Sequence, residues 1–128
     1  MESILIVDDD VNLCTVLQEE LCEIGYTAES VYNAEATLDY LASGKKVDLI
    51  LLDLKMPGKD GFYVLERLRA DKINVKVIVL TAYADVKSAI DSAKLGASDF
   101  ISKPYDLDEL LIAMRKVLQK EKETEDQF

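Results

Sequence analysis

The stretch VDLILLDLKMPGKDG, at residues 47–61, decides the fold of this chain. Residues 47–52 are almost continuously apolar, which is typical of a parallel strand buried on both faces. The run stops at Asp53, and a helical segment then opens at Asp60-Gly61 and continues through Phe62, Leu65 and Leu68. This stretch therefore predicts a buried strand, a polar loop and a helix that packs back on the sheet.

The same pattern of strand and helix repeats along the chain. Strand-like runs lie near residues 3–7, 27–31, 47–52, 75–80 and 98–102, with helical periods between them. The run at 27–31 is more polar than the others and predicts an edge strand. Five repeats of strand and helix predict an α/β fold with one parallel sheet and helices on both faces.

The spacing of apolar residues indicates the buried face of the predicted helices, and capping residues indicate where they begin or end. The first carries an apolar stripe terminated by Gly25, and the fifth begins near Asp106, a favourable N-cap residue. The second covers residues 34–41 and the fourth residues 85–95. The stripe of the first helix consists of Leu13, Val16, Leu17, Leu21 and Ile24, and that of the fifth of Leu107, Leu110, Leu111, Met114, Val117 and Leu118.

Length and composition limit what the chain can be. With 128 residues, 49% of them hydrophobic, it fits one domain at residues 1–120, followed by a charged tail at 121–128 that we expect to fray. A net charge of −10 argues against direct binding to nucleic acid, because such proteins present a basic patch. No run is long enough to span a bilayer and no signal peptide is visible, so we expect a cytoplasmic protein without membrane contact.

Cys14 and Cys22 would lie about 12 Å apart along the axis of one helix, too far for a disulfide. Two thiols in a chain without histidine cannot complete a zinc site either. We expect both to be buried, reduced thiols.

Polar side chains follow the predicted strands at the points where they end. Asp8 and Asp9 follow the first strand, Asp53 the third, Thr81 the fourth and Lys103 the fifth. In a doubly wound, flavodoxin-like sheet of strand order 2-1-3-4-5, the first and third strands are neighbours, and ligands bind at this edge. We therefore expect these five side chains to form one site.

The chemistry of the five groups indicates phosphoryl transfer. Clustered carboxylates repel unless a cation neutralises them, and oxygen ligands without histidine or cysteine favour Mg²⁺. A hydroxyl and an ammonium could hold phosphoryl oxygens while one carboxylate acts as the nucleophile. Asp53 is the best nucleophile because it stands alone after a central strand, whereas Asp8 and Asp9 stand side by side like metal ligands.

Each group also has an ordinary structural interpretation. The aspartates at 8–10 could cap a helix on a solvated loop, and Thr81 and Lys103 could be turn residues. Because all of these residues follow the ends of predicted strands, we favour a single functional site over separate caps and turns.

Four segments in this order carry a family resemblance: ILIVDDD at 4–10, DLILLDLKMPGKDG at 48–61, VIVLTA at 77–82 and GASDFISKPYDLDEL at 96–110. From Ile4 to about Leu118, the chain resembles the receiver domain of bacterial two-component response regulators. Within that family, TAYADVKSAI and KPYDLDEL are most similar to receivers attached to σ54-dependent transcription activators.

The resemblance implies an acceptor and a metal site. Asp53 would accept the phosphoryl group. Asp8, Asp9, Asp53 and the backbone carbonyl of Lys55 would hold Mg²⁺, with Asp9 as a direct ligand and Asp8 often acting through water.

It also implies a switch. Thr81 would reorient toward a phosphoryl oxygen, Lys103 would pair with the phosphate, and Phe100 would occupy the aromatic switch position. The Lys103–Pro104 peptide bond is cis in the family.

Lys55 and Tyr83, two residues past Asp53 and Thr81, should flank the approach of a hydrolytic water. A small amide and a carboxylate there could orient water, whereas a long cation and a bulky ring would shield the phosphoryl group. We therefore expect slow self-dephosphorylation.

By the same resemblance, the chain is a signalling domain with intrinsic phosphotransfer and not a conventional enzyme. Its phosphoryl donor would be a phosphohistidine of a sensor histidine kinase or phosphotransfer protein, since this chain has no histidine. Phosphorylation would change which partner the domain binds, or would cause it to form a homodimer. The chain could be a stand-alone relay protein or part of a longer regulator.

The output surface is expected on the fourth helix, fifth strand and fifth helix. Residues expected to line or rim it are Tyr83, Lys87, Asp91, Lys94, Tyr105 and Arg115.

Three other functions fit part of the pattern. A flavodoxin would need a phosphate loop rich in hydroxyl and glycine residues where this chain has three aspartates. A Mg²⁺-dependent phosphatase of small molecules would carry a second aspartate at the position of Lys55, and a substrate cap. A degenerate receiver would lack part of the site, whereas all five positions are filled here.

Overall fold

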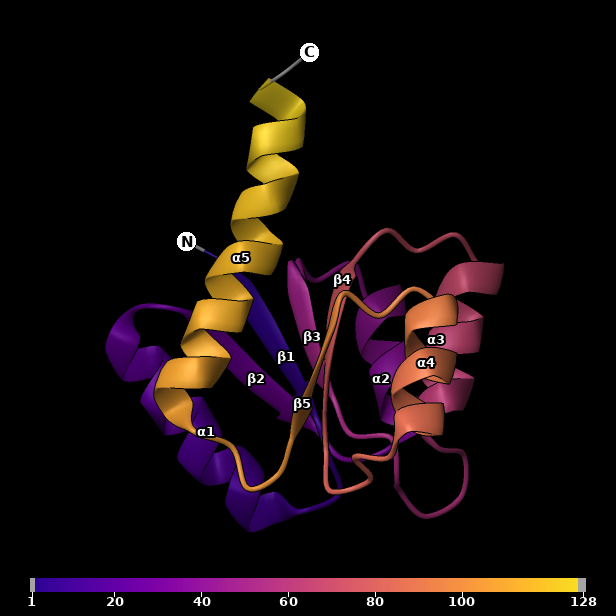
Figure 1. Ribbon diagram of the computed structural model, residues 1–128. Coiled ribbons are helices and arrows are strands. Elements are labelled where there is room, and N and C mark those ends of the chain that lie inside the picture. Colours follow the sequence, from indigo (N-terminus) through magenta and orange to yellow (C-terminus); the bar gives the residue numbers. More distant parts are fainter. Residues whose placement is uncertain (1, 127–128) are drawn as a thin grey trace.

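The computed structural model describes the backbone of residues 2–126 and the side chains of residues 2–119. Five strands form one parallel sheet in the order β2-β1-β3-β4-β5, with helices on both faces (Figure 1). The predicted α/β fold and strand order are therefore confirmed. In chain order the elements are β1 (Ser3–Val7), α1 (Val11–Ile24), β2 (Thr27–Val31), α2 (Ala34–Ala42), β3 (Leu49–Leu52), α3 (Gly61–Ala70), β4 (Lys76–Thr81), α4 (Val86–Lys94), β5 (Asp99–Ser102) and α5 (Leu107–Asp126).

The two-residue period of the strands divides their side chains between two apolar layers. In β1, Ile4 and Ile6 pack with residues of α1 and α5, whereas Leu5 and Val7 pack with residues of α2 and α3. Figure 1 shows the same division, with α1 and α5 on one side of the sheet and α2, α3 and α4 on the other. Burial on both faces explains why every residue of β3 is apolar and buried.

Side-chain caps determine where the helices begin. The residue before each of α1 to α4 accepts a backbone N–H of the first turn; these residues are Asp10, Asn33, Asp60 and Asp85. Asp106 accepts from the N–H groups of Asp108 at 2.8 Å and Glu109 at 3.3 Å, so the predicted cap of α5 is confirmed. Each such cap contributes about 1 kcal/mol.

The buried stripe of α1 is narrower than its sequence period predicted. Val16 and Ile24 are 54% and 44% exposed, because α1 buries only the side that faces the sheet. Cys22 is also exposed, so the expectation of two buried thiols holds for Cys14 alone. The buried residues of α1 are Cys14, Leu17 and Leu21.

The last helix is longer than expected. α5 continues to Asp126, although the sequence favoured a frayed tail at 121–128; residues 127–128 lie outside the described part of the chain. Between residues 2 and 126, no helix combines the length and the apolar character needed to cross a membrane.

Candidate functional site

The sheet register places two buried carboxylates side by side. Val7 of β1 pairs with Leu52 of β3, and the N–H of Asp53 donates to the carbonyl of Val7 at 2.9 Å. Asp8 and Asp53 are the next residues on the two strands, and they are 2% and 6% exposed. They meet between β1 and β3, where the chain order reverses and open α/β sheets bind their ligands.

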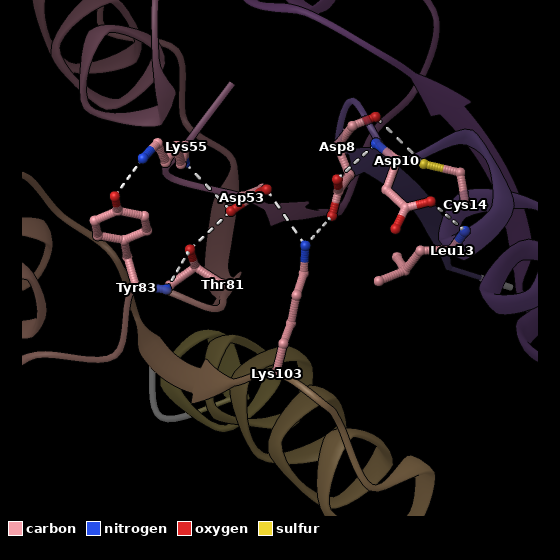
Figure 2. A network of polar contacts seen from close by, with 9 residues as sticks. All are labelled: Asp8, Asp10, Leu13, Cys14, Asp53, Lys55, Thr81, Tyr83 and Lys103. Atoms are coloured by element: carbon pink, nitrogen blue, oxygen red, sulfur yellow. Dashed lines mark hydrogen bonds and ion pairs between the residues drawn. The ribbon is translucent and has the colours of Figure 1, made fainter. Parts of the chain in front are cut away.

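β4 and β5 deliver a hydroxyl and an ammonium to the same edge. Oγ1 of Thr81 donates to Oδ1 of Asp53 at 2.7 Å. Nζ of Lys103 donates to Oδ2 of Asp8 at 2.6 Å and to Oδ2 of Asp53 at 3.3 Å. Figure 2 shows the ammonium between the two carboxylates. The Lys103–Pro104 peptide bond is cis, as the family resemblance implied.

The aspartates form a group of oxygen donors. Asp8, Asp9 and Asp53 each offer a carboxylate oxygen, and these atoms lie within 4.8 Å of one another. Asp10 has a different role, because its carboxylate caps α1 by accepting from the N–H of Leu13 at 3.1 Å. Three carboxylates beside one ammonium leave excess negative charge, and donors that are all oxygen suit a hard divalent cation. The residues present therefore fit a divalent metal.

The protonation equilibria of the site agree with this interpretation. Burial raises the pKa of Asp8, and the hydrogen bonds from Lys103 and from the N–H of Asp10 offset this only in part. Burial opposes the charge of Lys103, but its hydrogen bond to Asp8 and the charges of Asp8 and Asp53 raise its pKa. The ammonium is thus held in its charged form, while ionised Asp8 is disfavoured until more positive charge arrives.

The loop after β3 folds tightly over Asp53. The N–H of Lys55 donates to Oδ1 of Asp53 at 3.2 Å, and the N–H of Gly61 donates to the carbonyl of Leu54 at 2.9 Å. A Cβ at Gly61 would lie 2.7 Å from Cα of Leu54 and would also overlap the carbonyl oxygen of Asp53. The sequence marked Gly61 only as a helix start, since its close approach to Asp53 is a tertiary contact.

Lys55 and Tyr83 contact each other. Nζ of Lys55 donates to the Tyr83 hydroxyl and lies 4.3 Å from the centre of its ring. The N–H of Tyr83 donates to Oγ1 of Thr81 at 3.2 Å. In Figure 2 this pair lies on the side of Asp53 away from Asp8. Both residues line a cavity of about 420 Å³ together with Asp9, Asp53, Met56, Pro57, Thr81 and Ala82.

Phe100 lies in β5, outside this polar network. Its half-buried ring packs against the apolar layer that faces α2 and α3. Its role as the switch residue stays a prediction.

The residues expected at the output surface differ in exposure. Lys87, Lys94 and Arg115 are exposed, and Tyr83 is 46% exposed. Tyr105 is half-buried, and its hydroxyl donates to Oε1 of Glu20 in α1 at 2.6 Å, so its place on the output surface stays a prediction.

The apolar face of α4 was missed from the sequence. Val86 and Ile90 are 76% and 49% exposed, and Ser92 is the one buried residue of this helix. Their spacing of four residues places them on one face. Spacing alone does not tell whether such a face is covered by the rest of the protein.

Comparison with known proteins agrees with the fold. Residues 4–115 match the family described as the response regulator receiver domain. The chain is 38% identical to sporulation initiation phosphotransferase F of Bacillus subtilis over 117 residues, which cover 91% of this chain and 94% of the relative. It is 35% identical to regulatory protein AtoC of Escherichia coli, but the match covers 91% of this chain and only 25% of AtoC.

A solved structure is similar over nearly the same range. The response regulator TrrA of Thermotoga maritima, in complex with Mg²⁺–BeF, superposes with a TM-score of 0.82 and 37% identity, covering 92% of this chain and 100% of TrrA. The family match spans most of the chain and the parallel sheet has the expected order. The chain therefore belongs to the response regulator receiver domain family, a family of signalling domains that act with histidine kinases or phosphotransfer proteins.

Proposed function

We propose that Asp53 accepts a phosphoryl group from a phosphohistidine of a sensor histidine kinase or phosphotransfer protein, in a Mg²⁺-dependent reaction. The proposal rests on the groups that surround the buried carboxylate of Asp53. Its Oδ1 lies 2.7 Å from the hydroxyl of Thr81, and its Oδ2 lies 3.3 Å from the ammonium of Lys103. The donor histidine belongs to the other protein, because this chain has none.

In the transfer step, a carboxylate oxygen of Asp53 bonds to phosphorus while the bond from phosphorus to the histidine nitrogen breaks. The electron pair of that bond returns to the imidazole, and the product is an acyl phosphate. Lys103 and Thr81 pair with the equatorial oxygens as their charge develops. Asp8, Asp9, Asp53 and the carbonyl of Lys55 would hold Mg²⁺, which neutralises charge on the carboxylates and the phosphoryl oxygens when bound.

Mass spectrometry tests the acceptor directly. Incubation with acetyl phosphate and Mg²⁺ should add one phosphate to the parent and none to Asp53→Asn, whose amide is a poor nucleophile. Omission of Mg²⁺ should also prevent the gain. Circular dichroism of the variant controls for folding, and uptake by a folded Asp53→Asn would refute the assignment.

Thr81 and Phe100 would then form the switch. The Thr81 hydroxyl is engaged with Asp53 and must leave Oδ1 to reach a phosphoryl oxygen. Its departure gives the half-buried ring of Phe100 room to move, which couples the site to the surface as a two-state shift. Beryllofluoride with Mg²⁺ should perturb amide NMR signals across residues 83–105. Shifts confined to the surroundings of Asp53 would contradict the switch.

The output surface would be the face formed by α4, β5 and α5, including the exposed side chains of Val86 and Ile90. Burying them against a partner or a second copy would be favourable, because each exposes apolar area to water. Size-exclusion chromatography with and without beryllofluoride tests the homodimer. An unchanged elution volume for the activated parent would exclude self-association at the concentration used.

Lys55 and Tyr83 would set the lifetime of the phosphoryl group. Their mutual contact holds a cation and a ring beside the cavity that contains Asp53. Such a pair hinders the in-line approach of water, so we expect slow self-dephosphorylation and sustained output.

A further inference from the structure

One hydrogen bond ties the connection between β5 and α5 to helix α1. The hydroxyl of Tyr105 donates to Oε1 of Glu20 at 2.6 Å, and both residues are half-buried. Tyr105 comes two residues after Lys103, and α1 starts directly after the aspartate run that contains Asp8. The bond therefore links the two segments that supply the ammonium and one of the carboxylates it contacts.

The Tyr105 side chain is well suited to hold this link. Its ring packs against the apolar layer formed by α1, α5 and the sheet. Burial, and then the hydrogen bond to Glu20 and its negative charge, raise the pKa of the Tyr105 hydroxyl. The hydroxyl thus stays a donor, and hydrogen bonds to a charged acceptor are stronger than neutral ones.

The backbone around Lys103 has few other anchors on this side. Its own N–H donates to the carbonyl of Thr81 at 2.9 Å, which is the last rung of the pairing between β4 and β5. Pro104 has no N–H and cannot extend that pairing. The next side-chain contact along the chain is that of Tyr105, followed by the cap that Asp106 provides to α5.

The position of the Lys103 backbone matters because its ammonium is a compact charge on a long, flexible stem. The ammonium lies 2.6 Å from Asp8 and 3.3 Å from Asp53, and both distances depend on where the stem begins. A shift of the connection would change the pairing with a phosphoryl oxygen on Asp53, while Asp8, Asp9 and Asp53 would stay in place.

We propose that Tyr105 is a positioning residue for the phosphoryl site. Its hydrogen bond to Glu20 holds the β5–α5 connection against α1 and thereby holds the Lys103 ammonium where it can pair with a phosphoryl oxygen. This inference rests on the proposed roles of Asp53 and Lys103.

The test compares two affinities in Tyr105→Phe, which keeps the packed ring and removes only the hydroxyl. The affinity for Mg²⁺ measures whether the carboxylates keep their arrangement. The affinity of the Mg²⁺-loaded protein for beryllofluoride measures whether Lys103 can still pair with the bound phosphoryl mimic. We expect Mg²⁺ affinity that is not weakened, since moving a competing cation off the carboxylates cannot reduce it. We expect beryllofluoride binding weakened about fivefold, the change that corresponds to a hydrogen bond of about 1 kcal/mol. Unchanged beryllofluoride binding would overturn the proposal. So would a parallel loss of both affinities, which would indicate a general displacement of α1.

A double-mutant comparison tests whether one bond is responsible. Glu20→Ala alone should weaken beryllofluoride binding to the same extent, and the double variant should be no weaker than either single variant. Losses that multiply would show that the two residues act separately, and would overturn the proposal.

Tyr63→Phe is the matched control. Its hydroxyl accepts from Nη1 of Arg67 at 3.1 Å on α3, and no hydrogen bond among the side chains of residues 2–119 joins Tyr63 to the β5–α5 connection. We expect parent values for both affinities, and a similar loss in this variant would also count against Tyr105. Phosphate uptake by the parent is measured first: its absence refutes the proposed function, whereas normal uptake with unaltered Tyr105→Phe affinities refutes only this inference.

Discussion

Replacing Gly61 with alanine should displace Asp53 without changing any side chain of the site. The added carbon would lie 2.7 Å from Cα of Leu54 and would overlap the carbonyl oxygen of Asp53. Carbon atoms in contact settle at about 3.5–4.0 Å, so the loop must shift by about 1 Å. The obstructing atoms belong to the backbone, and they cannot rotate away as the end of a side chain could.

The magnitude follows from two opposing effects. Overpacking of this kind costs up to about 3 kcal/mol. Alanine in place of glycine at the start of α3 regains up to about 1 kcal/mol of helix propensity, so we expect a net loss of about 2 kcal/mol in the free energy of unfolding. A displacement of about 1 Å at a reacting group can cost as much as 100-fold in rate, so we expect phosphate uptake to slow at least tenfold.

Gly58→Ala is the control within the same loop. Gly58 has a φ of +78°, so alanine is strained there by about 1–2 kcal/mol, but nothing lies within 4 Å of its Cβ. The two variants should lose similar stability in urea unfolding and differ in the rate of uptake from acetyl phosphate, followed by mass spectrometry. Uptake at the parent rate by folded Gly61→Ala, or equal slowing in Gly58→Ala, would refute the steric argument.

Three further changes test the charges and the shielding of the site. Lys103→Ala should lower the free energy of unfolding by about 3 kcal/mol at pH 7, because it leaves Asp8 buried without its partner. Without Lys103, the pKa of Asp8 would rise further above its value in the unfolded chain, so the native state would bind a proton first as the pH falls. The loss of unfolding free energy should therefore shrink between pH 7 and about pH 4 in urea titrations. A loss that stays constant over this range would contradict the pairing. Asp9→Ala should abolish phosphate uptake, leave the fold intact and raise the thermal midpoint in EDTA by about 2 °C, since it relieves repulsion in the carboxylate cluster; an unchanged or lower midpoint would count against that repulsion. The phosphorylated double variant Lys55→Asn, Tyr83→Glu should lose its phosphoryl group about tenfold faster than the parent, and equal decay would refute the shielding.

The elements and the five principal site positions could be predicted from the sequence because both depend on local pattern. An apolar run buried on both faces predicted β3, and Asp106 predicted the start of α5. Parallel strands place their carboxyl ends at one edge, so residues that follow successive strands must gather there once the strand order is known. The proximity of Asp8 and Asp53 follows from this rule.

Only the tertiary structure decided which groups touch and which faces are covered. The spacing of Val16 in α1 and of Val86 in α4 marks a helix face, but whether that face is buried depends on neighbouring elements, and both side chains are exposed. The hydroxyl of Tyr105 bonds to Glu20, which is 85 positions away in the chain, and no local pattern predicted that contact. Such contacts depend on side-chain direction and on how closely two segments approach, and the spacing of apolar residues in the sequence determines neither.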